Sequence, residues 1–408
     1  MSEELDSILK KVSKSLDIRI GSMSDVGAEV EAISTGNFGV DDITGIGGIP
    51  RGRLSEFFGL QSSGKTTLAA QVAVEAQKMG LRVLYADFEQ AFDPKYARAL
   101  GIDVDDPEKF LFMQPDSLEQ GANAINELVG TGEIGLLVVD SVAAMMPEAM
   151  FDKEVGQATV AERAKLLSPF LGTLTVMAKQ TNTCCIFLNH EMELLDMGGR
   201  RRPGMPAIKT TPGGRALKFF ASLRLNFYSY GKVTTDTKDP LTGETVKLAL
   251  ATNVRVTVEK NKVGSPYRSA LGRIEFGKGM VQSYTVLHVL LAYKRITKGS
   301  GGIFRFKEGV PVPPLHEVND KGPYVKGEQN LLNILQENPA FLEQWLELAK
   351  ACLIAEEEPV PEKVVAELLP GSNELKDMFG ADEEDAELAG LLASEGYKPA
   401  AMDDLLAP

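Results

Sequence analysis

The segment Gly59-Leu-Gln-Ser-Ser-Gly64-Lys65-Thr66 constrains the fold more than any other part of the chain. It matches the phosphate-binding pattern G-x-x-x-x-G-K-[ST] in full, directly after a strand-like apolar run and directly before a strongly helical one. Glycines let backbone N–H groups turn towards phosphate oxygens, the helix N-terminus adds a favourable dipole, and Lys65 would reach the β- and γ-phosphates. A plain glycine-rich turn is the alternative, but the strand before and the helix after favour a nucleotide site.

A nucleotide bound in this way needs a magnesium ion, and two residues suit it. Thr66 offers a hydroxyl at the start of the helix, and Asp140 ends the apolar run Gly135-Leu-Leu-Val-Val-Asp140. Alone that acid is a weak signal, but it is a strong one downstream of a phosphate loop. We therefore expect ATP with Mg²⁺ held by Thr66 and Asp140. The expected nucleotide contacts in and beside the loop are Gly59, Gln61, Ser62, Ser63, Gly64, Lys65, Thr66 and Thr67.

Hydrolysis also needs a group that orients or deprotonates water. The strand-like run that begins at Arg82 ends in two carboxylates, Asp87 and Glu89, and alternation along a strand would direct both to one side. We choose Glu89 as the base, partly on the resemblance described below. The alternative is that both carboxylates are surface charges at a strand end.

Short β-rich runs alternate with helical stretches from about Ile33 to Phe276. This alternation predicts an α/β fold with a mostly parallel sheet covered by helices, and the irregular last three runs suggest an antiparallel, hairpin-like extension. The expected divisions are an N-terminal helix and linker over 1–29, a core over 30–279, a small C-terminal domain over 280–355 and a disordered acidic tail over 356–408. The N-terminal helix is expected because apolar residues recur there at helical spacing: Leu5, Ile8, Leu9, Val12 and Leu16.

The net charge of −14 at first argues against nucleic acid, because proteins that bind phosphate backbones usually carry an excess of bases. Most of the acidity, however, lies in the tail. Residues 355–408 hold 15 acids and 3 bases, whereas the rest of the chain holds 42 and 40. Residues 197–235 hold eight bases and no acid. That stretch is either a solvated face or a phosphate-binding segment.

Two further features indicate the cellular compartment. The three cysteines are too few for a disulfide framework, and two of them stand side by side in an apolar run, which favours structural thiols in a reducing environment. No run of about 18 apolar residues occurs, and the chain begins with acids rather than a basic or apolar leader. We expect a cytoplasmic protein that does not bind membranes.

Several short motifs follow one another in a specific order along the chain. Besides the phosphate loop they are Ile33-Ser-Thr-Gly36, Gly47-Gly-Ile-Pro50, Asp93-Pro-Lys-Tyr96, Val138-Val-Asp-Ser-Val-Ala-Ala144, Gly213-Gly-Arg-Ala-Leu-Lys218 and Lys260-Asn-Lys262. In this order they resemble the RecA family of DNA strand-exchange recombinases. The resemblance covers residues 30–276, is fainter around Lys326 to Pro339, and implies a RecA-type P-loop ATPase core.

The resemblance assigns roles to residues that the local sequence leaves open. Tyr96 would stack on adenine with Asp93 nearby, although a tyrosine after a strand and turn is more often core packing. Members of the family bind ATP between copies, so Lys260 and Lys262 would reach the γ-phosphate on a neighbouring copy; otherwise they are a solvated strand end. Glu89 would activate water.

Asn189 and His190 close the strand-like run that begins at Cys184, and by the same resemblance they would sense the γ-phosphate. Most bacterial relatives have glutamine where this chain has His190, and a histidine there is similar to the recombinases of T4-type phages. An imidazole can be charged or neutral near pH 7. We hypothesise that His190 couples the γ-phosphate to the following loop; an ordinary, satisfied polar residue is the alternative.

Two loops resemble those with which the family binds single-stranded DNA. The first spans residues 155–168, where Val160 would insert between bases and Lys165 and Ser168 would meet phosphate. The second spans residues 191–213 and has no aromatic side chain, so we expect binding directed to the backbone and tolerant of sequence. The residues assigned to the second loop and its end are Arg200, Arg201, Arg202, Lys209, Gly213, Gly214 and Arg215.

The sequence thus predicts an ATP-dependent homologous recombinase that forms filaments on single-stranded DNA, pairs it with duplex DNA and exchanges strands. The alternatives are a ring-forming motor or helicase subunit with the same fold, and a nucleotide-bound filament that serves as a non-catalytic platform. The N-terminal helix would lie on a neighbouring copy or pack on its own core. The tail would compete with DNA for the basic loops. Its short apolar islands would dock on a single-strand-binding protein or a loader, and plain disorder is the alternative.

Overall fold

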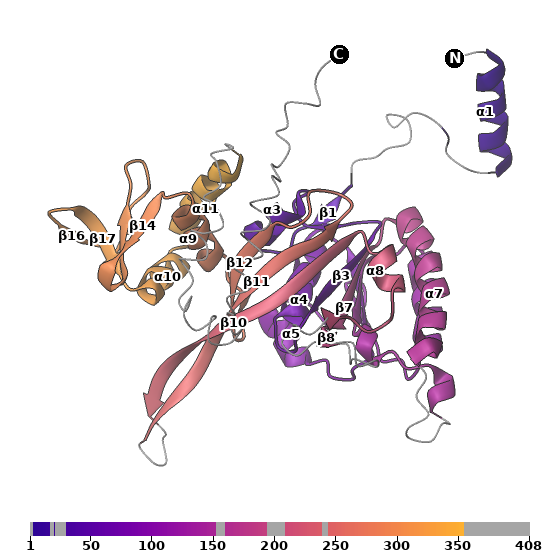
Figure 1. Cartoon of the computed structure of the whole chain (residues 1–408), viewed down its shortest axis with the longest axis horizontal. Coiled ribbons are helices and arrows are strands. Elements are labelled where there is room, and N and C mark those ends of the chain that lie inside the picture. The colour runs from indigo at the N-terminus through magenta and orange to yellow at the C-terminus, as the bar shows by residue number, and fades with distance from the viewer. Residues whose placement is uncertain are drawn as a thin grey trace, which may run out of the picture. The chain divides into compact units, whose positions relative to one another are not determined.

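The computed structural model describes residues 3–16, 20, 30–151, 160–193, 209–238 and 244–354 (Figure 1). The chain divides into two compact units, Met1–Val289 with Leu331–Leu342, and Leu290–Asn330 with Glu343–Pro408. The domain bounds expected from the sequence remain a prediction, and the expected disordered tail lies outside the described residues. The expected N-terminal helix is α1 (Glu3–Leu16), on which Leu5, Ile8 and Leu16 are exposed.

The first unit is built on a mixed sheet. Its nine strands among the described residues follow the order β13-β12-β11-β10-β3-β7-β6-β4-β5, parallel from β10 to β5 and antiparallel from β10 to β13. The expected α/β class and its antiparallel extension are confirmed. The strands are β3 (Leu54–Gly59), β4 (Arg82–Asp87), β5 (Phe110–Met113), β6 (Ile134–Asp140), β7 (Cys184–His190), β10 (Leu223–Lys238), β11 (Thr245–Asn261), β12 (Ser269–Glu275) and β13 (Gly279–Met280).

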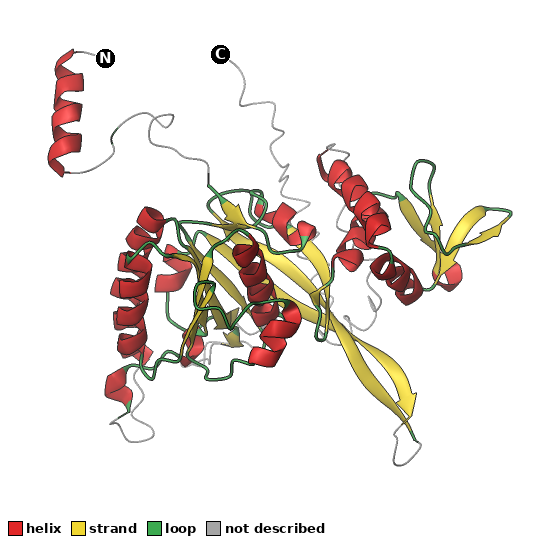
Figure 2. Cartoon of the chain, turned by 180° about the vertical axis from the view of Figure 1, so that it is seen from behind, coloured by secondary structure: helices red, strands yellow, loops and turns green. Residues whose placement is uncertain are grey.

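Helices cover both faces of this sheet (Figure 2). The short pairs β1 (Ala32–Ile33) with β2 (Ile49–Pro50), and β8 (Met192–Glu193) with β9 (Lys209–Thr210), lie outside it. The helices and turns are α3 (Phe38–Thr44), α4 (Lys65–Lys78), α5 (Pro94–Leu100), α6 (Leu118–Gly130), η1 (Val142–Ala144), η2 (Glu148–Met150), α7 (Val160–Thr181), α8 (Ala216–Phe220), α9 (Gln282–Ala292), α10 (Glu328–Glu337) and α11 (Pro339–Ile354). No described helix is both long and apolar enough to cross a bilayer.

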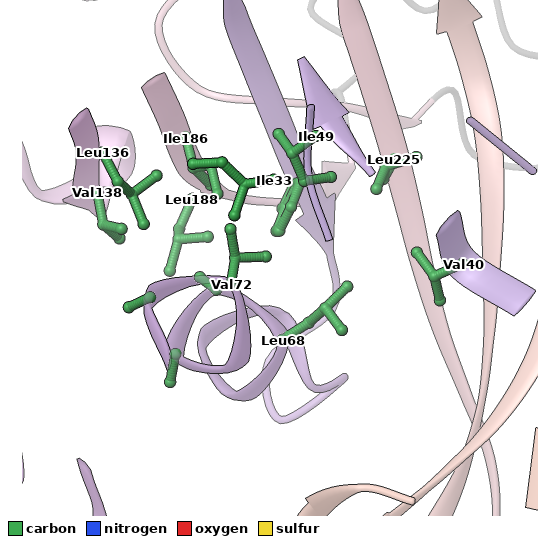
Figure 3. Packing of buried hydrophobic residues seen from close by; sticks show 14 of the residues in the cluster. Ile33, Val40, Ile49, Leu68, Val72, Leu136, Val138, Ile186, Leu188 and Leu225 are labelled. Carbon is green, nitrogen blue, oxygen red and sulfur yellow. The ribbon is translucent and has the colours of Figure 1, made fainter. Parts of the chain in front are cut away.

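Apolar side chains on both faces of the inner strands explain why the strand sequences show no polar alternation. On one face Val138 and Ile186 pack against Leu68 and Val72 of α4 (Figure 3). On the other, Val139 and its neighbours pack against α6 and α7. Each such Leu, Val or Ile contributes roughly 1.5–3 kcal/mol when fully buried. The sheet therefore rigidly supports the loops at the carboxyl ends of its parallel strands.

The ends of β10 and β11 extend beyond their neighbours as a two-stranded ribbon (Figure 1). Strand β3 pairs with β10 only over residues 223–227, and β12 pairs with β11 only over residues 251–257. In the ribbon, Val246, Leu248 and Leu250 are exposed.

The second unit contains a small antiparallel sheet in the order β14-β15-β17-β16. Its centre is Trp345, which is fully buried, packs 5.9 Å from the ring of Phe306 and donates from Nε1 to the carbonyl of Pro311. The elements of this unit are β14 (Ile296–Gly299), η3 (Ser300–Gly302), β15 (Ile303–Phe306), β16 (Glu317–Asn319) and β17 (Gly322–Lys326).

Candidate functional site

The predicted phosphate loop joins β3 to α4 and opens onto a cavity of about 810 Å³. Gly64 has φ 96°, and a Cβ atom there would lie 2.0 Å from Ile274 Cδ1. At Gly59 a Cβ atom would lie 2.2 Å from the carbonyl oxygen of Phe227. Both positions therefore require glycine. The cavity brings together these predicted residues: Gln61, Ser62, Ser63, Gly64, Lys65, Thr66, Thr67, Glu89, Tyr96, Asp140 and His190.

Lys65 is only 6% exposed. Its ammonium donates to the carbonyl of Leu60 at 2.7 Å, to that of Gly59 at 3.2 Å and to Ser63 Oγ at 3.4 Å. Burial lowers the pKa of Lys65, and the carboxylates around the cavity oppose that shift. The loop thus holds a buried cation among oxygen acceptors at its own centre.

Thr66 and Asp140 both line the cavity and lie within hydrogen-bonding distance of each other, as expected for two ligands of one magnesium ion. Thr66 Oγ1 donates to Asp140 Oδ2 at 3.4 Å, and the hydroxyl of Tyr85 donates to the same oxygen at 2.7 Å. Burial raises the pKa of Asp140 to about 6, although the Tyr85 hydrogen bond opposes this. A hydroxyl and a buried carboxylate are oxygen donors suited to Mg²⁺.

Glu89 faces the cavity between two hydrogen-bond donors. Ser141 Oγ donates to Glu89 Oε1, and His190 Nε2 lies 3.0 Å from the same oxygen. Burial raises the pKa of Glu89, but the hydrogen bonds from Ser141 and His190 outweigh it and hold the pKa below its usual value. The carboxylate is therefore ionised near neutral pH and able to accept a proton.

Asp87 has a different environment from Glu89. Strand β4 ends at Asp87, so the alternation expected along the strand does not continue to Glu89. Asp87 is 2% exposed, and its carboxylate accepts from the backbone N–H of Phe92 and from Gln114 Nε2. It organises the loop after β4 and does not line the cavity.

Asp93 and Tyr96 lie at the start of α5. Asp93 caps this helix, since its carboxylate accepts from the backbone N–H groups of Lys95 and Tyr96. The Tyr96 ring is half-buried at the cavity wall, and its hydroxyl lies 3.0 Å from Thr67 Oγ1. The cap therefore orients a ring beside the phosphate loop, and stacking on adenine stays a prediction.

Lys260 and Lys262 do not line the cavity of their own chain. Lys260 Nζ donates to the carbonyls of Lys218 at 2.6 Å and Phe219 at 3.0 Å, and Lys262 Nζ lies 3.4 Å from the carbonyl of Phe219. Lys262 lines a separate cavity of about 410 Å³ beside Phe219 and Phe220. Both ammonium groups thus meet at the end of α8.

The predicted DNA-binding residues are only partly described. Lys165 and Ser168 are exposed on α7, and Val160 begins that helix with its side chain outside the description. Residues 152–159 and 194–208, including Arg200, Arg201 and Arg202, also lie outside the described residues, as does the side chain of Lys209. Gly214 and Arg215 are exposed.

Gly213, which the resemblance assigns to DNA binding, is held in place by contacts within the protein. It is buried, and a Cβ atom there would lie 3.0 Å from Val142 Cγ1 and 3.1 Å from Leu167 Cδ1. The end of the second loop therefore packs against both α7 and the turn that follows Asp140. Gly213 thus lies beside a turn whose Ala143 and Ala144 line the cavity.

Sequence reasoning missed Ser141, Tyr85 and Arg163. Ser141 holds Glu89, Tyr85 holds Asp140, and Arg163 Nη1 on α7 donates to the carbonyl of Ala143 in the turn after Asp140. Only the adjacency of Ser141 to Asp140 carried a signal in the sequence.

Several known proteins resemble this chain in sequence or in structure. A sequence profile described as the RecA N-terminal domain matches residues 1–281. "Protein RecA" of Thermus aquaticus is 36% identical over 347 residues, covering 84% of this chain and 91% of the relative. That of Ectopseudomonas oleovorans is 38% identical over 304 residues, covering 74% and 81%. A crystal structure of the RadB recombinase is similar at 23% identity and a TM-score of 0.41, covering 61% of this chain and 98% of that one.

Proposed function

This chain belongs to the RecA family, and on that premise we propose how its residues carry out the family's reaction. It is an ATP-dependent homologous recombinase that forms filaments on single-stranded DNA, with a DNA-dependent ATPase activity. The observation that carries the proposal is the convergence of Lys65, Thr66, Glu89 and Asp140 on one cavity.

ATP would bind with its phosphates in the loop from Gly59 to Thr66. Lys65 would exchange its carbonyl contacts for β- and γ-phosphate oxygens, and Tyr96 would lie against the adenine. Thr66 and Asp140 would hold Mg²⁺, which would supply positive charge against the phosphates. A cation at this place would also keep Asp140 ionised.

Hydrolysis transfers the γ-phosphoryl group to water and releases ADP. Glu89 would accept the proton of the attacking water while the bond to the bridging oxygen breaks. Ser141 would keep one carboxylate oxygen oriented, and the other oxygen would then face the attacking water. His190 shares the first oxygen, so a γ-phosphate that draws the imidazole away would change the orientation of the base. That exchange is how His190 would sense ATP.

Lys260 and Lys262 would act on the nucleotide of a neighbouring copy. Their distance from their own cavity and their convergence at the end of α8 support a role in trans. Positive charge supplied from outside a site stabilises the charge that develops on the transferring phosphoryl group. The exposed stripe of α1 would contact a neighbouring copy in the same filament.

The central test is ATP hydrolysis with and without single-stranded DNA. We expect DNA to stimulate the rate, and Lys65→Ala to abolish hydrolysis in both conditions because the phosphate loop loses its buried cation. Steady-state release of phosphate measures both. A rate that DNA leaves unchanged would contradict the assignment of DNA binding to this chain.

Replacement of Arg200, Arg201 and Arg202 together by alanine tests the second DNA loop. Each lost phosphate contact should reduce the slope of log affinity against log salt by roughly 0.7 for single strands. We therefore expect weaker binding, a slope flatter by about 2, and unchanged binding of ATP without DNA. Fluorescence anisotropy of a labelled oligonucleotide across a salt series measures the slope, and an unaltered slope would place DNA elsewhere.

The tail and the compartment remain proposals. The acidic residues of 356–408 would compete with DNA for the basic loops, and their apolar islands would dock on a single-strand-binding protein or a loader. A cytoplasmic location agrees with the three cysteines, which are buried free thiols.

A further inference from the structure

Polar side chains form a row across four neighbouring strands of the sheet, buried except at its outer end, where the Glu259 side chain is 47% exposed. We define the polar row as Glu259 on β11, Arg224 on β10, Glu56 on β3 and Asn189 on β7. Glu56 and Asn189 are fully buried, and Arg224 is 7% exposed. Charges in such a place are costly unless every partner is present. No step proposed above uses Arg224 or Glu56.

Arg224 links the two carboxylates of the row. Its Nε donates to Glu56 Oε2 at 2.6 Å, and its Nη1 donates to Glu259 Oε2 at 2.8 Å. The β10–β11 register shifts between Arg224 and Leu225, so Glu259 is the extra residue of a β-bulge. The bulge is what allows the side chain of Glu259 to reach the guanidinium.

Asn189 forms the other end of the row and has three separate contacts. Its Nδ2 donates to Glu56 Oε1 at 2.8 Å and to the carbonyl of Pro212 at 3.1 Å, and its Oδ1 accepts from the backbone N–H of His190 at 3.0 Å. One amide therefore connects Glu56 to the nucleotide cavity and to the end of the second DNA loop.

Lys260 stands beside the first end of the row. It is the cross-strand partner of Arg224. Burial lowers the pKa of Lys260, and the charges of Lys262 and Arg224 lower it further, whereas Glu56 raises it. Movement of the Lys260 ammonium towards another copy's phosphate would change the field at Arg224 and Glu56.

We propose that Arg224 and Glu56 are positioning residues that connect Lys260 and Lys262 to Asn189. Through them, engagement of a neighbouring copy's nucleotide shifts His190 and the end of the second DNA loop at Pro212. The polar row thus makes ATP hydrolysis cooperative between copies and couples it to DNA. This proposal rests on the proposed function, in which the two lysines act in trans.

The test is Glu56→Gln in the full-length chain. Glutamine preserves the shape and can keep only one of the two contacts, because its amide offers one acceptor and one donor end where Asn189 and Arg224 both donate. We expect the affinity for nucleotide without DNA to change less than about twofold. The concentration of single-stranded DNA that gives half-maximal ATP hydrolysis should rise about tenfold. The Hill coefficient for ATP should fall towards one.

A second variant, Glu56→Gln with Arg224→Met, separates this role from a purely structural one. Removing both charges avoids leaving one buried without a partner, so the melting temperature should recover relative to Glu56→Gln alone. Cooperativity and DNA coupling should stay lost, because the connection from β10 to Asn189 is still broken. Recovery of both to wild-type values would overturn the proposal, and so would unchanged coupling in either variant.

Arg82→Gln is the matched control. It removes an arginine that pairs with Glu108 and Glu133 at the other end of the parallel strands, and we expect wild-type cooperativity. If the proposed function were wrong, the wild-type chain itself would show no DNA-stimulated hydrolysis. If DNA stimulates hydrolysis by the wild type and by both polar-row variants to the same extent, only the role proposed for the polar row is refuted.

Discussion

Replacing Lys260 and Lys262 together by alanine is expected to lower DNA-stimulated ATP hydrolysis about 10³-fold, the effect of losing a cation supplied in trans to a phosphoryl transfer site. Binding of ATP should persist, because neither lysine lines the cavity of its own chain. Phosphate release on single-stranded DNA measures the loss. The matched control is Lys247→Ala, an exposed lysine on the same strand, which should leave the rate unchanged.

Mixing two inactive variants shows whether the lysines act between copies. A chain without Lys260 and Lys262 still carries Glu89, and a Glu89→Gln chain still carries both lysines. In a head-to-tail filament assembled from equal amounts of the two variants, roughly a quarter of the sites would combine an intact Glu89 with intact lysines from the neighbouring copy and regain activity. Absence of any recovery in verified mixed filaments would mean that the lysines act within their own chain or only support α8.

Glu89→Gln is expected to reduce hydrolysis by about 10²- to 10⁴-fold, the usual contribution of a general base. Glutamine can still accept the hydrogen bond from Ser141, so the cavity should keep its shape and its affinity for ATP. Because hydrolysis would no longer release the active state, filaments on DNA should persist longer. Single-turnover hydrolysis with radiolabelled ATP measures the chemical step, and electron microscopy follows the filaments.

The control for this variant is Glu133→Gln, an exposed carboxylate directly before β6. Its single-turnover rate should match wild type. A Glu89→Gln rate within about threefold of wild type would be far smaller than a general base accounts for, and it would assign proton removal to another group.

The sequence was most informative where a function depends on neighbouring residues. Gly59 and Gly64 need backbone conformations or close approaches that exclude a side chain, and that need is visible in the loop pattern itself. Asp140 was recognisable because a buried parallel strand leads into it. The apolar runs on either side of these residues predicted the α/β core correctly.

Side chains from distant strands were harder to anticipate. Asp87 and Glu89 look equivalent in the sequence, yet one is buried beneath a loop and the other faces the cavity, because β4 ends between them. Gly213 is assigned to a DNA-binding loop by the resemblance, and the structure adds that it is buried against Val142 and Leu167. Both outcomes depend on where a strand or loop ends in space, which no local pattern specifies.

The sequence by itself determined the phosphate loop, the acid that follows β6 and the class of the fold, since each depends on backbone conformation or on the burial of successive residues. Only the tertiary structure decided that Ser141, 52 positions from Glu89, and His190, 101 positions away, hold one carboxylate oxygen. It likewise decided that Arg224 and Glu56 join across β10 and β3. Such contacts arise from the order and register of strands, which bring carboxyl ends together only after the whole sheet has formed.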